Sequence, residues 1–152
     1  MERIASFTVD HTKLARGMYL SRVDGDVLTY DIRMKKPNGG DYLSNEALHT
    51  IEHLFATYAR NSRFKDGIIY VGPMGCRTGM YLLTRGLTHE QAIELVRESF
   101  KFISGYTEKI PGTSEAECGN CREHNLESAK LEAAAMIPVL ENWKPEMLKY
   151  NC

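Results

Sequence analysis

The chain has 152 residues, of which 43% are hydrophobic and 26% charged, which is typical of a globular protein with a single domain over residues 1–152. Its 19 Lys and Arg against 20 Asp and Glu give a formal net charge of −1, so we expect no nucleic-acid binding through a basic surface. No apolar run approaches the roughly 18 residues of a membrane span, and the charged first ten residues do not resemble a signal peptide. We therefore expect a cytoplasmic protein that does not contact a membrane.

Two extended runs, 18–23 and 27–34, predict a β-hairpin that turns at Asp24-Gly25, a dipeptide that tolerates the positive φ of a tight turn. In the second run every other residue from Leu28 to Met34 is apolar, so one face can pack on a core. The opposite face carries Arg33, which we expect to be free to meet a ligand.

A helix is predicted over about 45–61, because Ser44 can cap it and apolar residues follow at intervals of three and four. Two more strands are expected at 68–71 and 80–83. The connector between them, 72–79, holds three glycines and a proline, which indicates unusual backbone angles or close approach to a ligand.

Thr88 and Gln91 form a capping box that opens a helix ending near Gly105. A loop then runs to about residue 125, followed by a helix through 129–136 that Pro138 should kink or end. The mixture of strands and helices, with a hairpin among them, predicts an α+β fold with an antiparallel sheet.

The segment His49-Thr50-Ile51-Glu52-His53 is the first candidate for chemistry. Residues four apart lie on one face of a helix, so the two imidazoles can point at a common metal ion. Glu52 lies beside them without needing to bind the metal, a suitable position for a general base. Two histidines at this spacing also occur on ordinary surfaces and in cores, so a third ligand is needed to decide.

Cys118-Gly119-Asn120-Cys121 is the candidate source of that ligand. A redox dithiol normally opens a helix after a strand, a context that this loop lacks. Two alternatives stay open: a closed zinc site that uses both thiols, or an open catalytic site that uses only one.

Cys76 lies in the glycine-rich connector, apart from the other cysteines. A small buried thiol is the commonest fate of a cysteine. The charge of the neighbouring Arg77 would favour a reactive thiolate if that side chain points inward. Cys121 and Cys152 have no assigned role.

Four segments together resemble the LuxS family of S-ribosylhomocysteine lyases, which produce autoinducer-2. They occur in the family's order, and the resemblance spans essentially the whole chain. The segments are Ser6-Phe7-Thr8-Val9-Asp10-His11, His49-Thr50-Ile51-Glu52-His53-Leu54, Gly72-Pro73-Met74-Gly75-Cys76-Arg77-Thr78-Gly79 and Glu117-Cys118-Gly119-Asn120.

The resemblance implies an α+β fold in which helices pack on one face of an antiparallel sheet. It implies a homodimer that pairs through the sheets and shares its two active sites. It further implies one divalent metal per subunit, natively Fe²⁺ and replaceable by Zn²⁺ or Co²⁺, bound by His49, His53 and Cys118.

The implied reaction splits S-ribosylhomocysteine into homocysteine and 4,5-dihydroxy-2,3-pentanedione, the precursor of autoinducer-2, by two carbonyl migrations and a β-elimination. The resemblance makes Cys76 and Glu52 the acid–base groups of this reaction. It places Ser6, His11 and Arg33 around the substrate.

Two positions depart from the family's pattern. Tyr70 stands where many members carry an acidic residue, so contacts to the homocysteine part of the substrate are expected to differ. Cys121 is not one of the family's metal ligands, and its thiol can compete for the metal.

Two other functions fit parts of the sequence. An H-x-x-E-H zinc peptidase would use the helix motif but leave Cys76 and Cys118 idle. A non-catalytic interaction module would bind zinc through His49, His53, Cys118 and Cys121 together.

Overall fold

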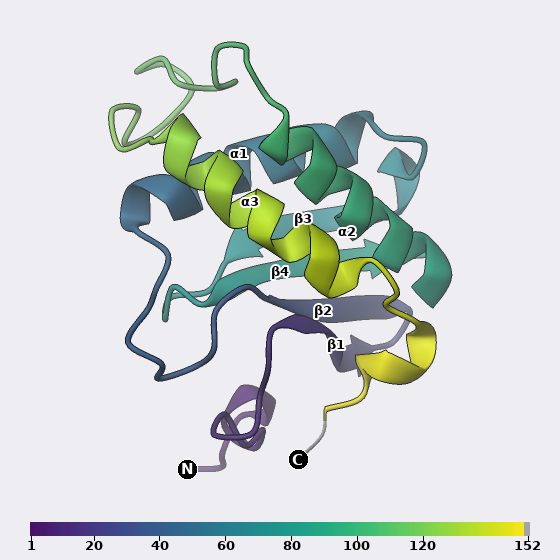
Figure 1. The fold of residues 1–152 in the computed structure, drawn as a ribbon. Helices are drawn as coiled ribbons and strands as arrows, with labels where there is room; N and C mark the ends of the chain where they lie inside the picture. The colour runs from purple at the N-terminus through teal and green to yellow at the C-terminus, as the bar shows by residue number, and fades with distance from the viewer. Residues whose placement is uncertain (151–152) are drawn as a thin grey trace.

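The computed structural model describes residues 1–150; Cys152, for which no role is predicted, lies outside the described residues. Its main elements follow the order β1, β2, α1, β3, β4, α2, α3 (Figure 1), with short 3₁₀ helices at Ala5–Phe7, Lys65–Gly67 and Pro145–Leu148. None of the helices in residues 1–150 has the length and apolar character needed to cross a bilayer.

Four strands form one antiparallel sheet in the spatial order β1-β2-β4-β3, which confirms the predicted α+β class. Their bounds are Gly17–Asp24 (β1), Val27–Arg33 (β2), Ile68–Pro73 (β3) and Gly79–Arg85 (β4).

The hairpin between β1 and β2 turns one residue later than predicted. Asp24 pairs with Val27, so the turn residues are Gly25 and Asp26. Gly25 has a φ of 63°, and a positive φ at the first position of a two-residue hairpin loop is the conformation that favours glycine there.

All three helices cover the same face of the sheet (Figure 1), as predicted. They are α1 (Asn45–Asn61), α2 (His89–Ser104) and α3 (Leu126–Leu140). The core between sheet and helices consists of fully buried apolar side chains, among them Met18, Tyr30, Ile32, Ile51, Phe55, Met80, Leu82, Phe100 and Met136.

The helix starts follow the predicted capping residues. The Ser44 hydroxyl accepts from the Ala47 amide at 3.1 Å, and both hydrogen bonds of the Thr88–Gln91 capping box are present. These contacts satisfy amide groups that the first turn of a helix leaves unpaired.

The last helix is longer than predicted, because α3 continues through Pro138 to Leu140. A proline removes one helical hydrogen bond, and here the helix ends two residues later, so little of it is disturbed. The Arg97 guanidinium also donates to the carbonyl of Leu140 at 2.6 Å and to that of Trp143 at 2.5 Å. The Leu140 carbonyl also accepts from the Trp143 amide at 3.1 Å, so the end of α3 and the segment after it are both bonded to Arg97 of α2.

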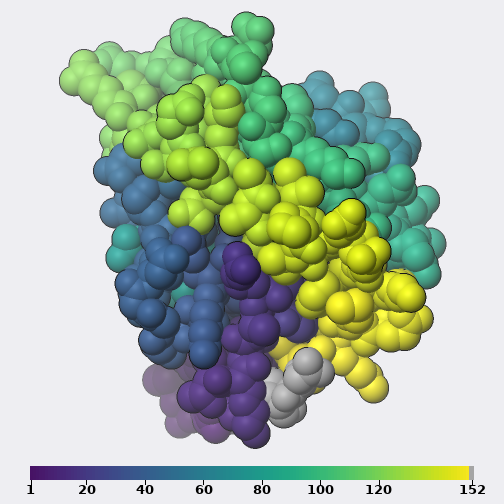
Figure 2. Space-filling view, in the orientation of Figure 1, coloured from purple at the N-terminus to yellow at the C-terminus, as the bar shows by residue number. Residues whose placement is uncertain are grey.

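The first and last parts of the chain meet on edge strand β1, where the purple and yellow segments lie side by side (Figure 2). The Trp143 indole donates to the Met18 carbonyl at 2.8 Å. The Tyr150 ring stacks on Tyr19 with ring centroids 5.1 Å apart. The C-terminal segment therefore covers the edge of the sheet that β1 forms.

Candidate metal centre and catalytic cysteine

The predicted metal ligands converge. His49 and His53 lie one turn apart on α1, with ring centroids 4.6 Å apart. The Cys118 Sγ lies 3.4 Å from the His49 Nε2 and 3.9 Å from the His53 Nε2. In a tetrahedral site with ordinary metal–sulfur and metal–nitrogen bonds these atoms are about 3.6 Å apart. The donor spacing therefore fits a transition-metal ion.

Backbone carbonyl groups fix the orientation of both imidazoles. The Nδ1 of His49 lies 2.8 Å from the Glu123 carbonyl oxygen, and the Nδ1 of His53 lies 2.8 Å from the Pro111 carbonyl oxygen. A carbonyl only accepts, so each Nδ1 carries a hydrogen, and Nε2 is the ring atom that faces Cys118 and could bind a metal.

A fourth residue, His124, belongs to this group and was missed by the sequence analysis. Its ring stacks on that of His49 at a centroid distance of 3.9 Å. One ligand atom from each of the four residues lies within 4.8 Å of all the others. We call His49, His53, Cys118 and His124 the metal cluster. The sequence offered one indication of this role, because His124 follows Cys118 by six residues in the same long loop.

His124 differs from the other two histidines in its partner. Its Nδ1 lies 3.0 Å from the Thr50 hydroxyl, which can donate or accept. Its Nε2 is buried and has no hydrogen-bond partner within residues 1–150. Burial, followed by the neighbouring His49 and His53, lowers the pKa of His124 to about 4, so this imidazole is neutral near pH 7.

Cys121 is a free, partly buried thiol. Within the described chain, the group that can hold a metal includes His124 and not Cys121. The closed site through both thiols, which would make the protein a zinc-stapled module, is therefore not the arrangement that the structure favours.

Glu52 is half-buried one residue before His53. It lines a surface groove together with His53, Arg60, Tyr70 and Gly112. A ligand bound in this groove beside His53 would therefore lie next to the Glu52 carboxylate.

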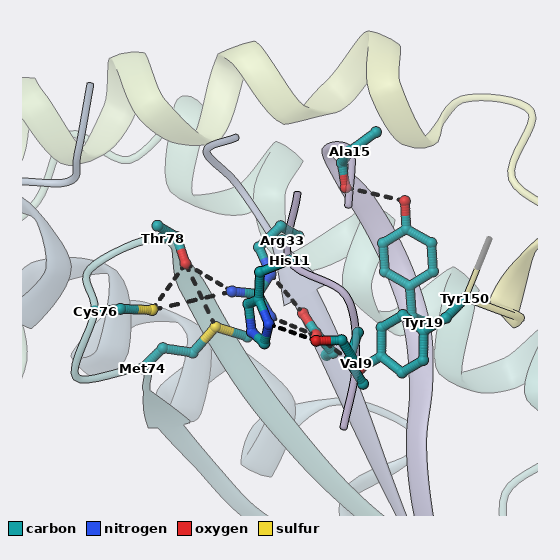
Figure 3. Close-up of polar contacts among 10 residues, drawn as sticks. Val9, His11, Ala15, Tyr19, Arg33, Met74, Cys76, Thr78 and Tyr150 are labelled. Atoms are coloured by element: carbon teal, nitrogen blue, oxygen red, sulfur yellow. Dashed lines mark hydrogen bonds and ion pairs between the residues drawn. The ribbon is translucent and has the colours of Figure 1, made fainter. Parts of the chain in front are cut away.

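Cys76 lies in the connector just before β4 and forms a second group of polar contacts (Figure 3). Its Sγ lies 3.0 Å from the Thr78 Oγ1, which accepts from the Arg33 Nη1 at 2.8 Å. The same Nη1 is 4.0 Å from the sulfur. We call Asp31, Arg33, Cys76 and Thr78 the cysteine cluster.

The positive charge beside Cys76 comes from Arg33, because the condition set for Arg77, that its side chain points inward toward Cys76, is not met. Arg77 has a φ of 60°, in the left-handed region, and its guanidinium donates to the Leu43 carbonyl at 3.2 Å. The turn at this residue thus directs its side chain to Leu43, and the residue next to Cys76 in sequence is not its electrostatic partner.

Arg33 lies on the predicted face of β2, but the expectation that it is free is wrong. Its side chain is 3% exposed and forms two hydrogen bonds to Asp31, at 2.6 and 3.1 Å. Tyr150 donates its hydroxyl hydrogen to the same carboxylate at 2.8 Å. A buried cation requires such a partner, because desolvation of an unpaired charge is costly.

The two predicted substrate residues near the N-terminus have local contacts of their own. Ser6 lies in the first 3₁₀ helix and lines an apolar groove with Tyr70, Tyr81 and Leu83. The His11 Nδ1 is 2.9 Å from the Val9 carbonyl oxygen. Within residues 1–150, no hydrogen bond connects Ser6 or His11 to the metal cluster or the cysteine cluster.

The β3–β4 connector and the first half of α1 lie at the same end of the molecule (Figure 1). The chain is thus an α+β protein with a His/Cys cluster that could hold a metal ion, and a cysteine near a buried arginine, at one end of its sheet. A family model described as S-ribosylhomocysteinase (LuxS) matches residues 4–147, and the chain belongs to this family.

Named relatives agree with this assignment. The chain is 47% identical to an S-ribosylhomocysteine lyase of Borreliella burgdorferi (strain ZS7), over 99% of both chains. It is 48% identical to proteins of the same name from Phocaeicola vulgatus and Porphyromonas gingivalis (strain W83), over 99% of this chain and 98% and 99% of theirs. The family resemblance stated from the sequence motifs is confirmed.

Proposed function

We propose that this chain is a metal-dependent carbon–sulfur lyase that cleaves S-ribosylhomocysteine into homocysteine and 4,5-dihydroxy-2,3-pentanedione. The convergence of the His49, His53 and Cys118 donor atoms in a chain of this family carries the proposal. With His49, His53 and Cys118 as the only ligands, and His124 stacked on His49 without binding the ion, one tetrahedral position stays open for substrate, as a catalytic metal requires. The peptidase alternative gives Cys118 and Cys76 no task.

The reaction must break a thioether bond far from the aldehyde carbon of the ribose. The carbonyl moves from C1 to C2 and then to C3, where it acidifies the proton on C4, and homocysteine leaves by β-elimination. Each migration takes a proton from one carbon and returns one to its neighbour. One side chain cannot reach every carbon, so two proton-transfer groups on the two sides of the sugar are needed.

We assign these transfers to Cys76 and Glu52. The Cys76 sulfur is exposed and hydrogen-bonded by its own cluster, and Glu52 opens into the groove beside His53. Positioned acid–base groups typically contribute about 10²- to 10⁴-fold to a rate. When bound, a divalent cation, for which we propose Fe²⁺ with Zn²⁺ or Co²⁺ as substitutes, supplies Lewis-acid stabilisation of negative charge developing on the sugar oxygens.

We further propose that two copies pair through their sheets and complete each other's sites. The helix-free face of the sheet carries an apolar groove, and Ile4, Phe7 and Tyr70 are more than half exposed there and at the N-terminus. Exposed apolar surface of this kind marks interaction sites. Pairing would bring Ser6 and His11 of one copy toward a substrate held by the other.

Leu83 offers a direct test of the pairing. Leu83→Asp should convert a dimer into a monomer in sedimentation analysis, because a charge would be buried in the apolar interface. The matched change on an exposed helix position, Leu131→Asp, should leave the dimer intact, since Leu131 is 74% exposed on α3. A wild-type monomer at micromolar concentration would contradict the pairing.

Incubation with S-ribosylhomocysteine tests the activity itself. Protein purified without oxygen and loaded with Fe²⁺ should release homocysteine, measured as free thiol and by mass spectrometry. The metal-stripped protein is the control. Casein cleavage without homocysteine release would contradict the lyase assignment and favour the peptidase.

A further inference from the structure

The hydrogen-bond donor of the Cys76 sulfur is defined by the partners of Thr78. A hydroxyl has one hydrogen and two lone pairs, whereas a guanidinium only donates. The Thr78 Oγ1 therefore accepts from Arg33 at 2.8 Å, and its hydrogen remains for a sulfur. The Cys76 Sγ at 3.0 Å is closer than the Met74 Sδ at 3.9 Å, and a thiolate can only accept, so a Cys76 thiolate receives that hydrogen.

Arg33 does not itself donate a short hydrogen bond to the Cys76 sulfur. Its Nη1 is 4.0 Å from the sulfur, longer than the distances of charge-assisted hydrogen bonds. The bidentate pairing with Asp31 holds the guanidinium back and compensates its charge. The sulfur is thus contacted by a hydroxyl whose oxygen is polarised by a cation, rather than by the cation itself.

We propose that Thr78 is a positioning residue for the lyase reaction, which donates its hydroxyl hydrogen to Cys76 and so holds the sulfur as an oriented thiolate. The inference rests on the proposed function, in which Cys76 transfers protons. Hydrogen bonds to a charged group favour that charged form, and a threonine bound at its oxygen by Arg33 has its hydrogen directed to the sulfur.

The backbone fixes Thr78 in this position. Its carbonyl accepts from the amides of Met34 at 2.8 Å and Lys35 at 3.0 Å, and its side chain is buried at 2% exposure. Arg77, with its left-handed φ of 60°, separates Cys76 from Thr78. Backbone strain of this kind persists where the surroundings hold it and is concentrated at functional sites.

Few ionisable groups face the sulfur. Arg33 and Asp31 approach from β2, and Tyr81 from β4. Burial and the charge of Asp31 raise the pKa of Tyr81, so that phenol stays protonated near neutral pH.

The test measures thiolate reactivity without turnover. Wild type and Thr78→Val, both metal-loaded full chains, react with iodoacetamide from pH 5 to 10, and mass spectrometry of the Cys76 peptide gives the rate at this residue alone. Valine keeps the shape of threonine and lacks the hydroxyl. We expect the midpoint of the rate–pH curve to rise by about one pH unit, and the rate at pH values below both midpoints to fall about tenfold.

Two controls separate a lost hydrogen bond from a disturbed site. The limiting rate at high pH should be equal in both proteins, because access to the sulfur is unchanged. Thr78→Ser, which retains the hydroxyl, should restore the wild-type midpoint. If Thr78→Val does not fold, Thr78→Ala, which also lacks the hydroxyl, should show the same rise.

An unchanged or lowered midpoint in a folded, metal-loaded variant without the hydroxyl would overturn the inference, as would a Thr78→Ser midpoint shifted as far as that of valine. The proposed function fails by a different result: a Cys76→Ser protein with full homocysteine release. That result would show that turnover does not need Cys76, and Thr78 would then have no role in the reaction either. The two failures are distinguishable, because one is seen in homocysteine release and the other in the alkylation rates.

Discussion

The metal cluster and the cysteine cluster lie at the same end of the sheet but differ in the charged groups that they contain. The cysteine cluster contains its own cation, and Arg33, Asp31 and Thr78 bind one another through buried hydrogen bonds. The metal cluster contains no cation of the chain, and the Nε2 of His124 has no partner within residues 1–150. The charges of one site are paired within the chain, whereas the other site could hold a metal ion.

The two clusters also differ in how the chain assembles them. The metal cluster joins a helix to a loop that lacks regular structure, through side-chain contacts to carbonyl groups. The cysteine cluster depends on strand register, which pairs Arg33 of β2 with Gly79 of β4. A Cβ at Gly79 would lie 2.0 Å from the Ile32 carbonyl oxygen, so only glycine permits this close pairing.

The largest expected effect comes from removing the sulfur ligand. Cys118→Ala should lower metal affinity by more than about 100-fold, because even supporting contacts behind a ligand contribute 10- to 100-fold. Metal content after dialysis, measured by mass spectrometry, and homocysteine release check this. Cys121→Ser is the matched control and should keep its metal; equal losses in both variants would restore the closed site with two thiols.

Cys76→Ser should separate the clusters functionally. We expect full metal content and a loss of homocysteine release of at least about 100-fold, because a serine hydroxyl is too weak an acid to exchange protons at neutral pH. Metal analysis and the thiol-release assay on the same preparation decide the matter. Full activity would exclude Cys76 from proton transfer.

Asp31→Asn tests whether the buried Arg33 depends on Asp31 as its counter-ion. The change leaves Arg33 buried without its counter-ion, and we expect it to lower the free energy of unfolding by about 3–5 kcal/mol. Asp26→Asn, at the exposed pair with Arg85, should change it by less than about 1 kcal/mol. Urea unfolding of the metal-loaded proteins gives both values, and similar losses would show that burial adds nothing.

The smallest effect concerns Tyr150 and alkaline pH. Burial, and next the negative charge of Asp31, raise the pKa of Tyr150 above its usual value near 10. The unfolded chain then loses this proton at lower pH than the folded protein, so stability is complete below about pH 10 and falls above it.

Tyr150→Phe should therefore make the decline in stability above pH 10 shallower. At pH 7 it should cost about 1 kcal/mol, the usual contribution of one hydrogen bond. Unfolding in urea at pH 7, 9, 10 and 11 measures both. A decline as steep as that of wild type would show that Tyr150 does not titrate differently in the folded protein.

Local signals predicted the elements well, because they are settled within a few residues. Ser44 and Thr88 cap the helices that they were expected to cap, and the 49–53 spacing brought two imidazoles together. Two elements differ from the prediction: the first hairpin turns one residue later, and the last helix continues two residues past Pro138, where Arg97 of a different helix donates to the Leu140 carbonyl. No local rule contains that contact.

The partners within each cluster were harder to predict, because they depend on the folded arrangement. Adjacency favoured Arg77 as the cation near Cys76, yet register in the sheet delivers Arg33 instead. His124 joins the metal cluster only when the loop folds back on α1. The presence of Cys118 in the cluster followed from family resemblance, whereas its spacing to His49 required the three-dimensional structure.

The long segment between α2 and α3, residues 105–125, has neither helix nor strand. It attaches to α1 through the Pro111 and Glu123 carbonyl groups, and the Asn125 amide at its end bonds to Thr50 at 3.0 Å. A bound ion would hold this segment in place through Cys118, in the way that buried apolar side chains hold together a domain. Copies that fail to acquire metal would present an unanchored stretch to proteases, so the lifetime of the protein in the cell would follow the supply of metal.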